Sequence, residues 1–175
     1  MSEGADFRAP TPPPGDPDGL PARDAAEIAA ARLHLLRHTR RELIIRVPRL
    51  ERELYASAEE WAELRRIAAA GRGAQIRILL HDPAAAQRDD HRLISLVQRL
   101  PSVLLVRMPV EEIDLAAPAS YLLTDTGGYL YQPDASRPLG RAALVDRASR
   151  RPLEQNFNEA WERSVRASML QPLDL

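Results

Sequence analysis

The sequence contains neither cysteine nor lysine, and all 24 of its basic residues are arginine. The missing cysteines exclude a disulfide framework and a thiolate metal site. The missing lysines exclude a Walker A phosphate grip, Schiff-base catalysis and a Ser-Lys dyad. Arginine cannot replace lysine as a base, because its guanidinium group stays protonated. The sequence therefore excludes several common sites for phosphate binding and nucleophilic catalysis.

Long apolar runs, net charge and aromatic residues are also scarce. No stretch of 18 apolar residues occurs, so we expect no transmembrane helix, and the first residues lack the basic and apolar segments of a signal peptide. The formal net charge is −1 and aromatic residues make up 5% of the chain, which argues against nucleic acid as a partner. The sequence thus predicts a cytoplasmic protein without membrane contact.

The composition changes once along the chain. Residues 1–21 are rich in proline, glycine and aspartate and have few large aliphatic side chains, which is typical of a disordered tail. Hydrophobic residues make up 45% of the sequence, enough for one core. We therefore expect a single domain over residues 22–168, followed by a short C-terminal tail over residues 169–175.

Hydrophobic spacing predicts the elements of this domain. Ile28, Ala31 and Leu35 recur at helical spacing, and Ser57 and Glu60 form a capping-box pattern that starts a second helix. The expected helices cover residues 22–39, 57–70, about 90–100, and about 152–165. The expected strands cover residues 43–47, 75–80, 103–106, 120–124, 129–131 and 142–145, and the fourth and fifth of these form a hairpin.

The predicted order is α-β-α-β-α-β-β-β-β-α. Strands that alternate with helices imply right-handed crossovers between parallel strands, with helices on the faces of the sheet. The closing hairpin adds antiparallel strands. We therefore expect an α/β fold with a mixed, mostly parallel sheet flanked by helices.

The last third of the chain resembles one half of a phospholipase D domain. The residues that support this are a strand ending at Asp125, a Gly127-Gly128 turn, strands over 129–131 and 142–145, and a helix with Phe157 and Trp161 four residues apart. The resemblance extends over residues 22–168 and implies a phospholipase D-like half-domain. The chain is also similar to small proteobacterial domains that have this fold without its active site.

The resemblance implies a catalytic signature of His-x-Lys followed by Asp, in which the histidine is the nucleophile and the lysine holds the phosphate. With Asp125 at the Asp position, Pro118 occupies the His position and Ser120 the Lys position. The Gly-Ser and Asn of active members are also missing, at residues 131–134. The first hypothesis is therefore a non-catalytic interaction or ligand-binding module that uses the carboxyl edge of the sheet.

A second hypothesis is an enzyme with a rebuilt site, a metal-dependent phosphodiesterase or nuclease. Its candidate residues follow the second strand and open the next helix: His81, Asp82, Asp89, Asp90, His91 and Arg92. Ligands bind at the carboxyl ends of strands in open α/β sheets, and carboxylates and imidazoles bind metals or act as general bases. The alternative is that the aspartates cap helices and His81 lies in a turn, and the frequency of such caps favours it.

A third hypothesis is nucleic-acid binding through two arginine-rich segments, residues 37–41 and 147–151. Interspersed acidic residues instead favour a solvated, salt-bridged surface. The expected partners are therefore a protein, a small anionic ligand or a second copy of the chain in a homodimer. The sequence indicates no cofactor and no metal. Asp125 and Ser120 complete the set of candidate site residues.

Overall fold

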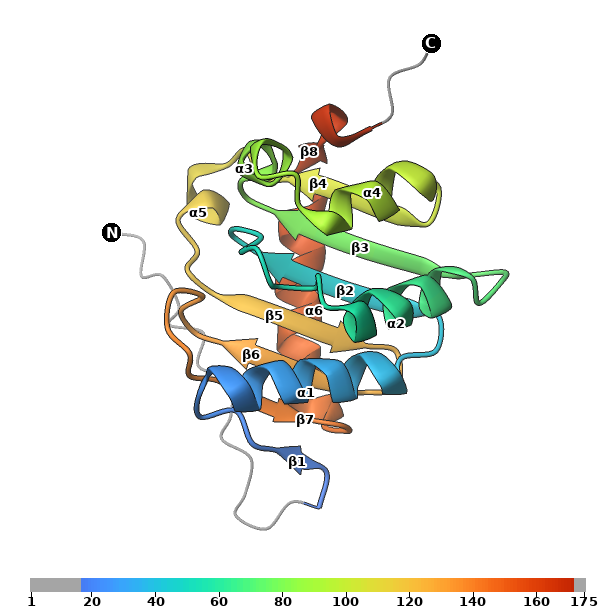
Figure 1. Cartoon of the computed structure of the whole chain (residues 1–175). Coiled ribbons are helices and arrows are strands. Elements are labelled where there is room, and N and C mark those ends of the chain that lie inside the picture. The colour runs from blue at the N-terminus through green and yellow to red at the C-terminus, as the bar shows by residue number, and fades with distance from the viewer. Residues whose placement is uncertain (1–16, 172–175) are drawn as a thin grey trace.

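The computed structural model describes residues 17–171, which form one eight-stranded sheet with helices on both faces (Figure 1). The strand order is β1-β7-β6-β5-β2-β3-β4-β8. The strands are β1 Gly19–Leu20, β2 Glu42–Val47, β3 Gln75–Leu80, β4 Leu104–Met108, β5 Ser120–Thr124, β6 Tyr129–Gln132, β7 Arg141–Ala143 and β8 Val165–Arg166. The helices are α1 Ala25–His38, α2 Ala58–Ala68, α3 Pro83–Arg88, α4 Arg92–Arg99, α5 Glu112–Leu115 and α6 Arg147–Glu162, followed by the 3-10 turn η1 Ser168–Leu170.

Short polar signals set the helix ends. Ser57 accepts a hydrogen bond from the backbone N–H of Glu60, and the Glu60 side chain accepts one from Ser57, which is the predicted capping box of α2. Asp146 caps α6, so this helix begins at Arg147 rather than near Pro152. The proline instead lies inside the helix, where it removes one backbone hydrogen bond.

The sheet is mostly antiparallel, and the prediction of a mostly parallel sheet was wrong. Within the described residues, only β2–β3 and β3–β4 pair in parallel. The other five pairings are antiparallel. A parallel pair needs a long crossover connection. After β4 the chain returns past the short helix α5 to place β5 antiparallel beside β2, and hairpin-type connections then add β6 and β7.

The two faces of the sheet differ in how completely helices cover them (Figure 1). Helices α1, α2 and α4 pack on one face and form the larger hydrophobic cluster. Helix α6 alone crosses the other face, where Phe157 and Trp161 pack against Ile44, Leu79 and Tyr129 in a second cluster. Because strand side chains alternate between faces, the arginines of β2, β3 and β4 lie on the α6 side.

Parts of both predicted tails lie outside the described residues, namely 1–16 and 172–175. Two residues of the predicted N-terminal tail, Gly19 and Leu20, pair with β7, and Leu170 of the predicted C-terminal tail is buried. The division of the chain at residues 22 and 168 stays a prediction. No helix within residues 17–171 is both long and apolar enough to span a bilayer.

Candidate functional site

Asp125 joins two neighbouring strands at one end of the sheet, although the residues involved are distant in sequence. Its carboxylate accepts backbone N–H hydrogen bonds from Arg40, Arg41 and Glu42 at 2.9, 2.8 and 3.2 Å. Partial burial raises the pKa of Asp125, but these hydrogen bonds outweigh burial and the net shift is downward. The residue therefore fastens the end of β5 to the beginning of β2.

Ser120 lies at the opposite end of β5 from Asp125, about 17 Å away at the usual rise per strand residue. Its hydroxyl donates to the Arg46 carbonyl oxygen at 3.1 Å. It also lines a groove of about 480 Å³ at the carboxyl end of β2. The groove contains both signs of charge, and each of its arginines has an acidic partner, in the pairs Arg32–Glu60, Arg49–Asp89 and Arg137–Asp134. Such a lining has no net preference for an anion.

A buried arginine organises the same edge of the sheet on the α6 side. Arg46 is 2% exposed, and its guanidinium group donates to Asn156 Oδ1 at 3.0 Å and to the Asp114 carbonyl oxygen at 3.1 Å. Tyr121 donates to the same Asn156 oxygen at 2.8 Å. Asp114 in turn pairs with Arg163. The positive charge of Arg46 is thus taken up by internal hydrogen bonds.

His81 accepts a longer hydrogen bond, at 3.4 Å, from Arg46 Nε. Burial, and then the neighbouring Arg46 charge, lower the pKa of His81 to about 4. The imidazole is therefore neutral near pH 7 and weakly basic. A general base is most effective when its pKa lies near the working pH, so this environment does not favour His81 in that role.

The other candidates of the rebuilt site occupy structural positions. Asp82 caps α3 and His91 caps α4, each accepting a backbone N–H. His91 is buried and its second ring nitrogen lies 3.0 Å from the Glu51 carbonyl oxygen. Asp89 pairs with Arg49 at 3.6 Å.

The remaining two candidates, Asp90 and Arg92, also have local explanations. Asp90 has a φ of 48°, a left-handed conformation that aspartate tolerates in turns. Arg92 lies over the Trp61 ring at 4.9 Å from its centroid. Among residues 17–171, no three His, Cys, Asp or Glu side chains come together as a metal-ligand group, so the structure does not assemble the predicted cluster.

The structure does assemble the two arginine-rich segments, around the turn between β5 and β6. On one side, Asp125 holds the backbone of Arg40 and Arg41. On the other side, Arg150 Nε donates to the Thr124 carbonyl oxygen at 2.8 Å. Two segments more than 100 residues apart in sequence therefore meet at residues 124–128.

Two further arginines extend this surface. The side chain of Arg147 packs against Gly127, which has a φ of +93°, so closely that a Cβ there would lie 3.2 Å from Arg147 Cγ. Arg41 donates to the Arg72 carbonyl oxygen at 3.3 Å, which joins the loop before β3 to the turn. We define the basic turn patch as Arg40, Arg41, Arg72, Arg147 and Arg151, all exposed.

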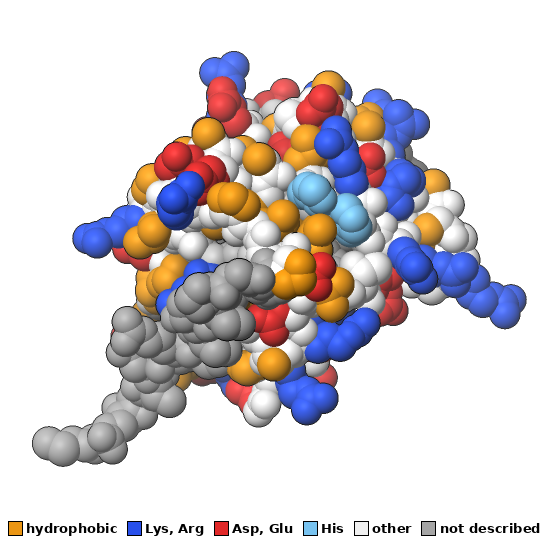
Figure 2. Space-filling model, turned by 90° about the horizontal axis from the view of Figure 1, so that it is seen from below, with side chains coloured by type: hydrophobic (Ala, Val, Ile, Leu, Met, Phe, Trp, Pro, Cys, Tyr) orange, Lys and Arg blue, Asp and Glu red, His pale blue; other side chains and the backbone are white. Residues whose placement is uncertain are grey.

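The charges of the basic turn patch are not neutralised by ion pairs. In the described part of the chain, none of its five arginines forms a salt bridge. Three acidic residues beside the turn have other partners: Asp125 binds backbone N–H groups, Asp146 binds Ser149, and Glu154 pairs with Arg150. Glu42, the exposed first residue of β2, forms no salt bridge within residues 17–171. Figure 2 shows basic side chains along its right-hand edge, with some acidic ones among them, at the end where β2 and β3 begin in Figure 1.

Sequence reasoning missed most of the polar cluster around Arg46. The available signal was a charged residue within the otherwise apolar strand 43–47. Its partners lie on α5 and α6, and nothing in their local sequence marks them as neighbours of β2. The arginine segments were identified as candidates, but their convergence on one turn was not.

Among the solved structures of other proteins that are similar to this chain are those of TrmBL2 and Nuc. TrmBL2, described as an archaeal chromatin protein with a novel mode of DNA binding, matches with a TM-score of 0.57 and 13% identity, over 83% of this chain and 52% of that chain. This chain thus spans about half the length of TrmBL2. Nuc from Salmonella typhimurium, a phospholipase D family member, matches with a TM-score of 0.51 and 9% identity, over 79% of this chain and 89% of that chain.

These likenesses confirm the phospholipase D-like fold. They also overturn the prediction that argued against nucleic acid as a partner, because a structure of similar fold is a DNA-binding protein. A low net charge does not prevent a local concentration of arginine. The comparison with curated proteins found no match. A family model described as a domain of unknown function, DUF7931, matches residues 24–173, and the chain belongs to that family.

Proposed function

We propose that this chain is a non-catalytic phospholipase D-like domain that binds the phosphate backbone of nucleic acid through the basic turn patch. The observation that supports this most directly is the set of five exposed arginines without ion pairs around residues 124–128. Guanidinium groups suit phosphate because they donate in a planar fork and remain charged. Phosphate contacts supply most of the affinity in sequence-independent binding.

The surroundings of the patch favour this role over a purely solvated surface. The backbone that presents Arg40 and Arg41 is fixed by the Asp125 carboxylate. Arg147 packs on Gly127, and its helix is fastened to the turn through Arg150. Arginines on a rigid frame lose less freedom when they bind, which preserves affinity.

The absence of catalysis is the second half of the proposal. Pro118 and Ser120 stand where the phospholipase D resemblance requires the nucleophile and the phosphate-binding lysine. Near Ser120, the guanidinium of Arg46 is occupied by internal hydrogen bonds, and His81 is a weak base. These environments support a domain that binds phosphodiesters without cleaving them.

The similarity to TrmBL2 supports the nucleic-acid part of the proposal in a limited way. At 13% identity it indicates a common fold, which is compatible with DNA binding. For this chain, nucleic-acid binding is inferred from the position of the arginines in the basic turn patch.

Fluorescence anisotropy with a labelled DNA duplex of about 20 base pairs at about 50 mM salt tests the proposal. The patch variant replaces four arginines of the patch by alanine: Arg40, Arg41, Arg147 and Arg151. A matched control variant replaces four exposed arginines from other parts of the surface: Arg23, Arg49, Arg88 and Arg137. We expect the wild type and the control to bind and the patch variant to lose binding at least 100-fold, on the order expected for four lost phosphate contacts.

Equal binding by the patch and control variants would refute the assignment of the patch. Cleavage of the duplex or of a generic phosphodiester by purified protein, abolished in the Ser120→Ala or His81→Ala variant, would refute the non-catalytic half. Circular dichroism on each variant establishes that the fold is retained.

A further inference from the structure

A second set of arginines lies on the α6 face and at the β4–β8 edge of the sheet beside it. Arg77 on β3, Arg107 on β4 and Arg166 on β8 form what we call the α6 row. None of the three forms a salt bridge within the described residues. The sheet here is covered by one helix, and Arg77 and Arg107 are only partly buried.

The aromatic side chains of α6 hold two members of the α6 row in place. Arg77 lies over the Phe157 ring at 5.2 Å and the Trp161 ring at 5.8 Å, measured to the centroids. Arg107 lies over Trp161 at 4.7 Å and donates to the Trp161 carbonyl oxygen at 3.0 Å. Cation–π contacts leave the charge of a guanidinium group uncompensated.

Helix α6 connects the basic turn patch to the α6 row, because Arg147 and Arg151 lie in its first turns and its aromatic residues contact Arg77 and Arg107. Burial lowers the pKa of the Arg77 guanidinium, two carboxylates (Glu42 and Glu154) oppose this, and the charge of Arg150 lowers it further. Arg150 itself is hydrogen-bonded to the turn at the centre of the patch. Arginines therefore lie at the N-terminal end of α6 and along its side on β3 and β4, and the carboxylates Glu42 and Glu154 lie beside Arg77 between them.

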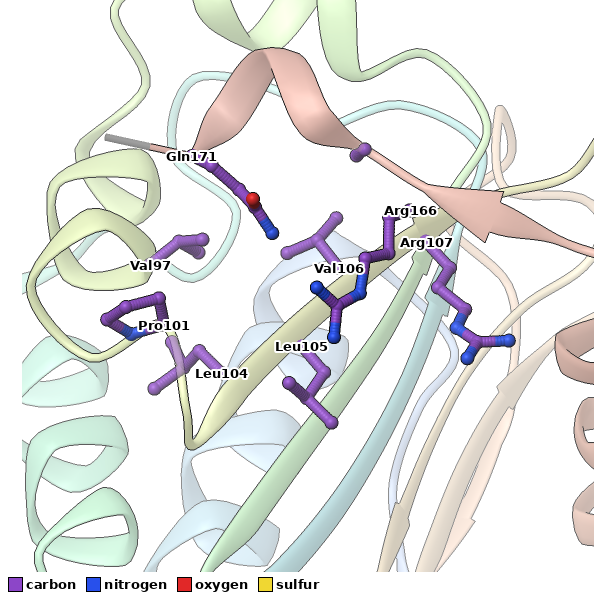
Figure 3. Close-up of a pocket in the computed structure, with 9 residues that line it drawn as sticks. Val97, Pro101, Leu104, Leu105, Val106, Arg107, Arg166 and Gln171 are labelled. Carbon is purple, nitrogen blue, oxygen red and sulfur yellow. The ribbon is translucent and has the colours of Figure 1, made fainter. Parts of the chain in front are cut away.

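The far end of the row contains two like charges on neighbouring strands. Arg107 and Arg166 are register partners in the β4–β8 pair, and like charges directly opposite each other are destabilising. Figure 3 shows the side chains of Arg107 and Arg166 diverging from each other. The Arg166 and Gln171 side chains are directed toward a cavity of about 60 Å³. Such a cavity holds roughly four water molecules, so a phosphate oxygen could displace one of them.

The nature of the exposed groups indicates which nucleic acid fits. Single strands are bound by aromatic side chains that stack on bases. Here Phe157 and Trp161 are buried, and Trp61, the most exposed of the described aromatic side chains, is overlain by Arg65 and Arg92. The surface thus offers guanidinium groups for phosphates and no platform for bases.

We propose that the α6 row continues the footprint of the basic turn patch and that the ligand is duplex DNA, one strand of which follows α6 and is contacted without regard to sequence. This inference rests on the proposed function. Helix α6 has 16 residues and is about 24 Å long, which corresponds to about seven base pairs at the duplex rise. The contacts are to the backbone, which fixes position and gives no base preference.

The experiment compares the Arg107→Ala/Arg166→Ala double variant with an Arg52→Ala/Arg88→Ala control. Binding is measured across a salt series to a duplex of about 12 base pairs, to its separated strands, and to a hairpin with a stem of about four base pairs. We expect preference for the duplex, and a salt slope for the duplex that is lower by about two in the row variant only. The short stem spans only part of the footprint, so the row variant and the control should bind it equally.

Each outcome has one meaning. Duplex binding that is unchanged in the row variant but lost in the patch variant overturns the α6 row and leaves the proposed function standing. Single strands bound as tightly as the duplex overturn the duplex assignment. Wild-type protein that binds neither form at about 50 mM salt overturns the proposed function itself.

Discussion

Replacing Asp125 with alanine separates a structural role for this carboxylate from a catalytic one. Asp125 is the only residue of the His-x-Lys-Asp signature that the chain retains, yet its oxygens accept three backbone N–H hydrogen bonds. A hydrogen bond to a charged group contributes about 1.5–3 kcal/mol when buried. Because the site is partly exposed, about 1 kcal/mol per bond is the appropriate scale, and the variant should lose about 3 kcal/mol of unfolding free energy.

Urea denaturation followed by tryptophan fluorescence measures this loss directly, and a thermal scan should show a fall in Tm of about 6–12 °C. Asp125→Asn keeps one acceptor oxygen and should lose less than the alanine variant. The matched control is Asp134→Ala, since the side-chain partners of Asp134 within residues 17–171 lie in its own loop, at Ser136 and Arg137. A loss below about 1 kcal/mol for Asp125→Ala would refute the structural role.

The pH dependence gives a second test of the same residue. The pKa of Asp125 in the folded protein lies below its ordinary value of 3.8, so the unfolded chain binds the proton more readily. The stabilisation is therefore present above pH 3.8 and is lost as the pH falls through the lower folded pKa. The stability difference between wild type and Asp125→Ala should be constant near neutrality and shrink in acid; a difference that grows in acid would contradict the sign.

Three further predictions concern other parts of the molecule. In a plot of the logarithm of duplex affinity against the logarithm of salt concentration, the five arginines of the basic turn patch should contribute a slope of about −4.5. This slope corresponds to a loss of affinity of about 500-fold between 50 and 200 mM salt. An unaltered slope in the four-alanine patch variant would exclude these contacts. The His81 ring should titrate near pH 4 in an NMR experiment, so that stability contributed by this residue is present above pH 6.5 and declines below it; a midpoint above 6 would show that burial and Arg46 do not act as described. Arg46→Ala should lower the free energy of unfolding by about 3–5 kcal/mol, because it leaves buried acceptors unpaired and creates a cavity. Arg46→Met should lower it clearly less. Equal losses for the two variants in urea denaturation would count against the hydrogen-bond network.

Features that depend on neighbouring residues could be predicted from the sequence. The capping box of Ser57 and Glu60 is formed as expected, and the β5–β6 hairpin follows from the glycines between the two strands. In both cases the determining contact spans only a few residues. Asp125 lies in the turn of this expected hairpin.

Features that depend on contacts between segments distant in sequence could not be predicted in the same way. The position of β5 beside β2 makes the sheet mostly antiparallel, and neither strand indicates its neighbour in its own sequence. The same limitation applies to Asp125, whose hydrogen-bond partners lie more than 80 residues earlier. For Arg46, a charge within an apolar strand is a general signal of an interior partner, but nothing in the local sequence identifies Asn156.

The two ends of the parallel strands differ in how their arginines are compensated, and this difference links the emptied site to the proposed one. At the carboxyl end, arginines lining the groove beside Ser120 all have acidic partners, and Arg46 is held internally. At the amino end, the five arginines of the basic turn patch have none among the residues that the structure describes. An anion approaching the carboxyl end must therefore break existing ion pairs, whereas one approaching the amino end meets exposed arginines that are free of ion pairs within residues 17–171 and are screened mainly by water and salt. Phosphate binding at this domain should consequently occur at the turn of residues 124–128 and not at the edge where the phospholipase D resemblance places its chemistry.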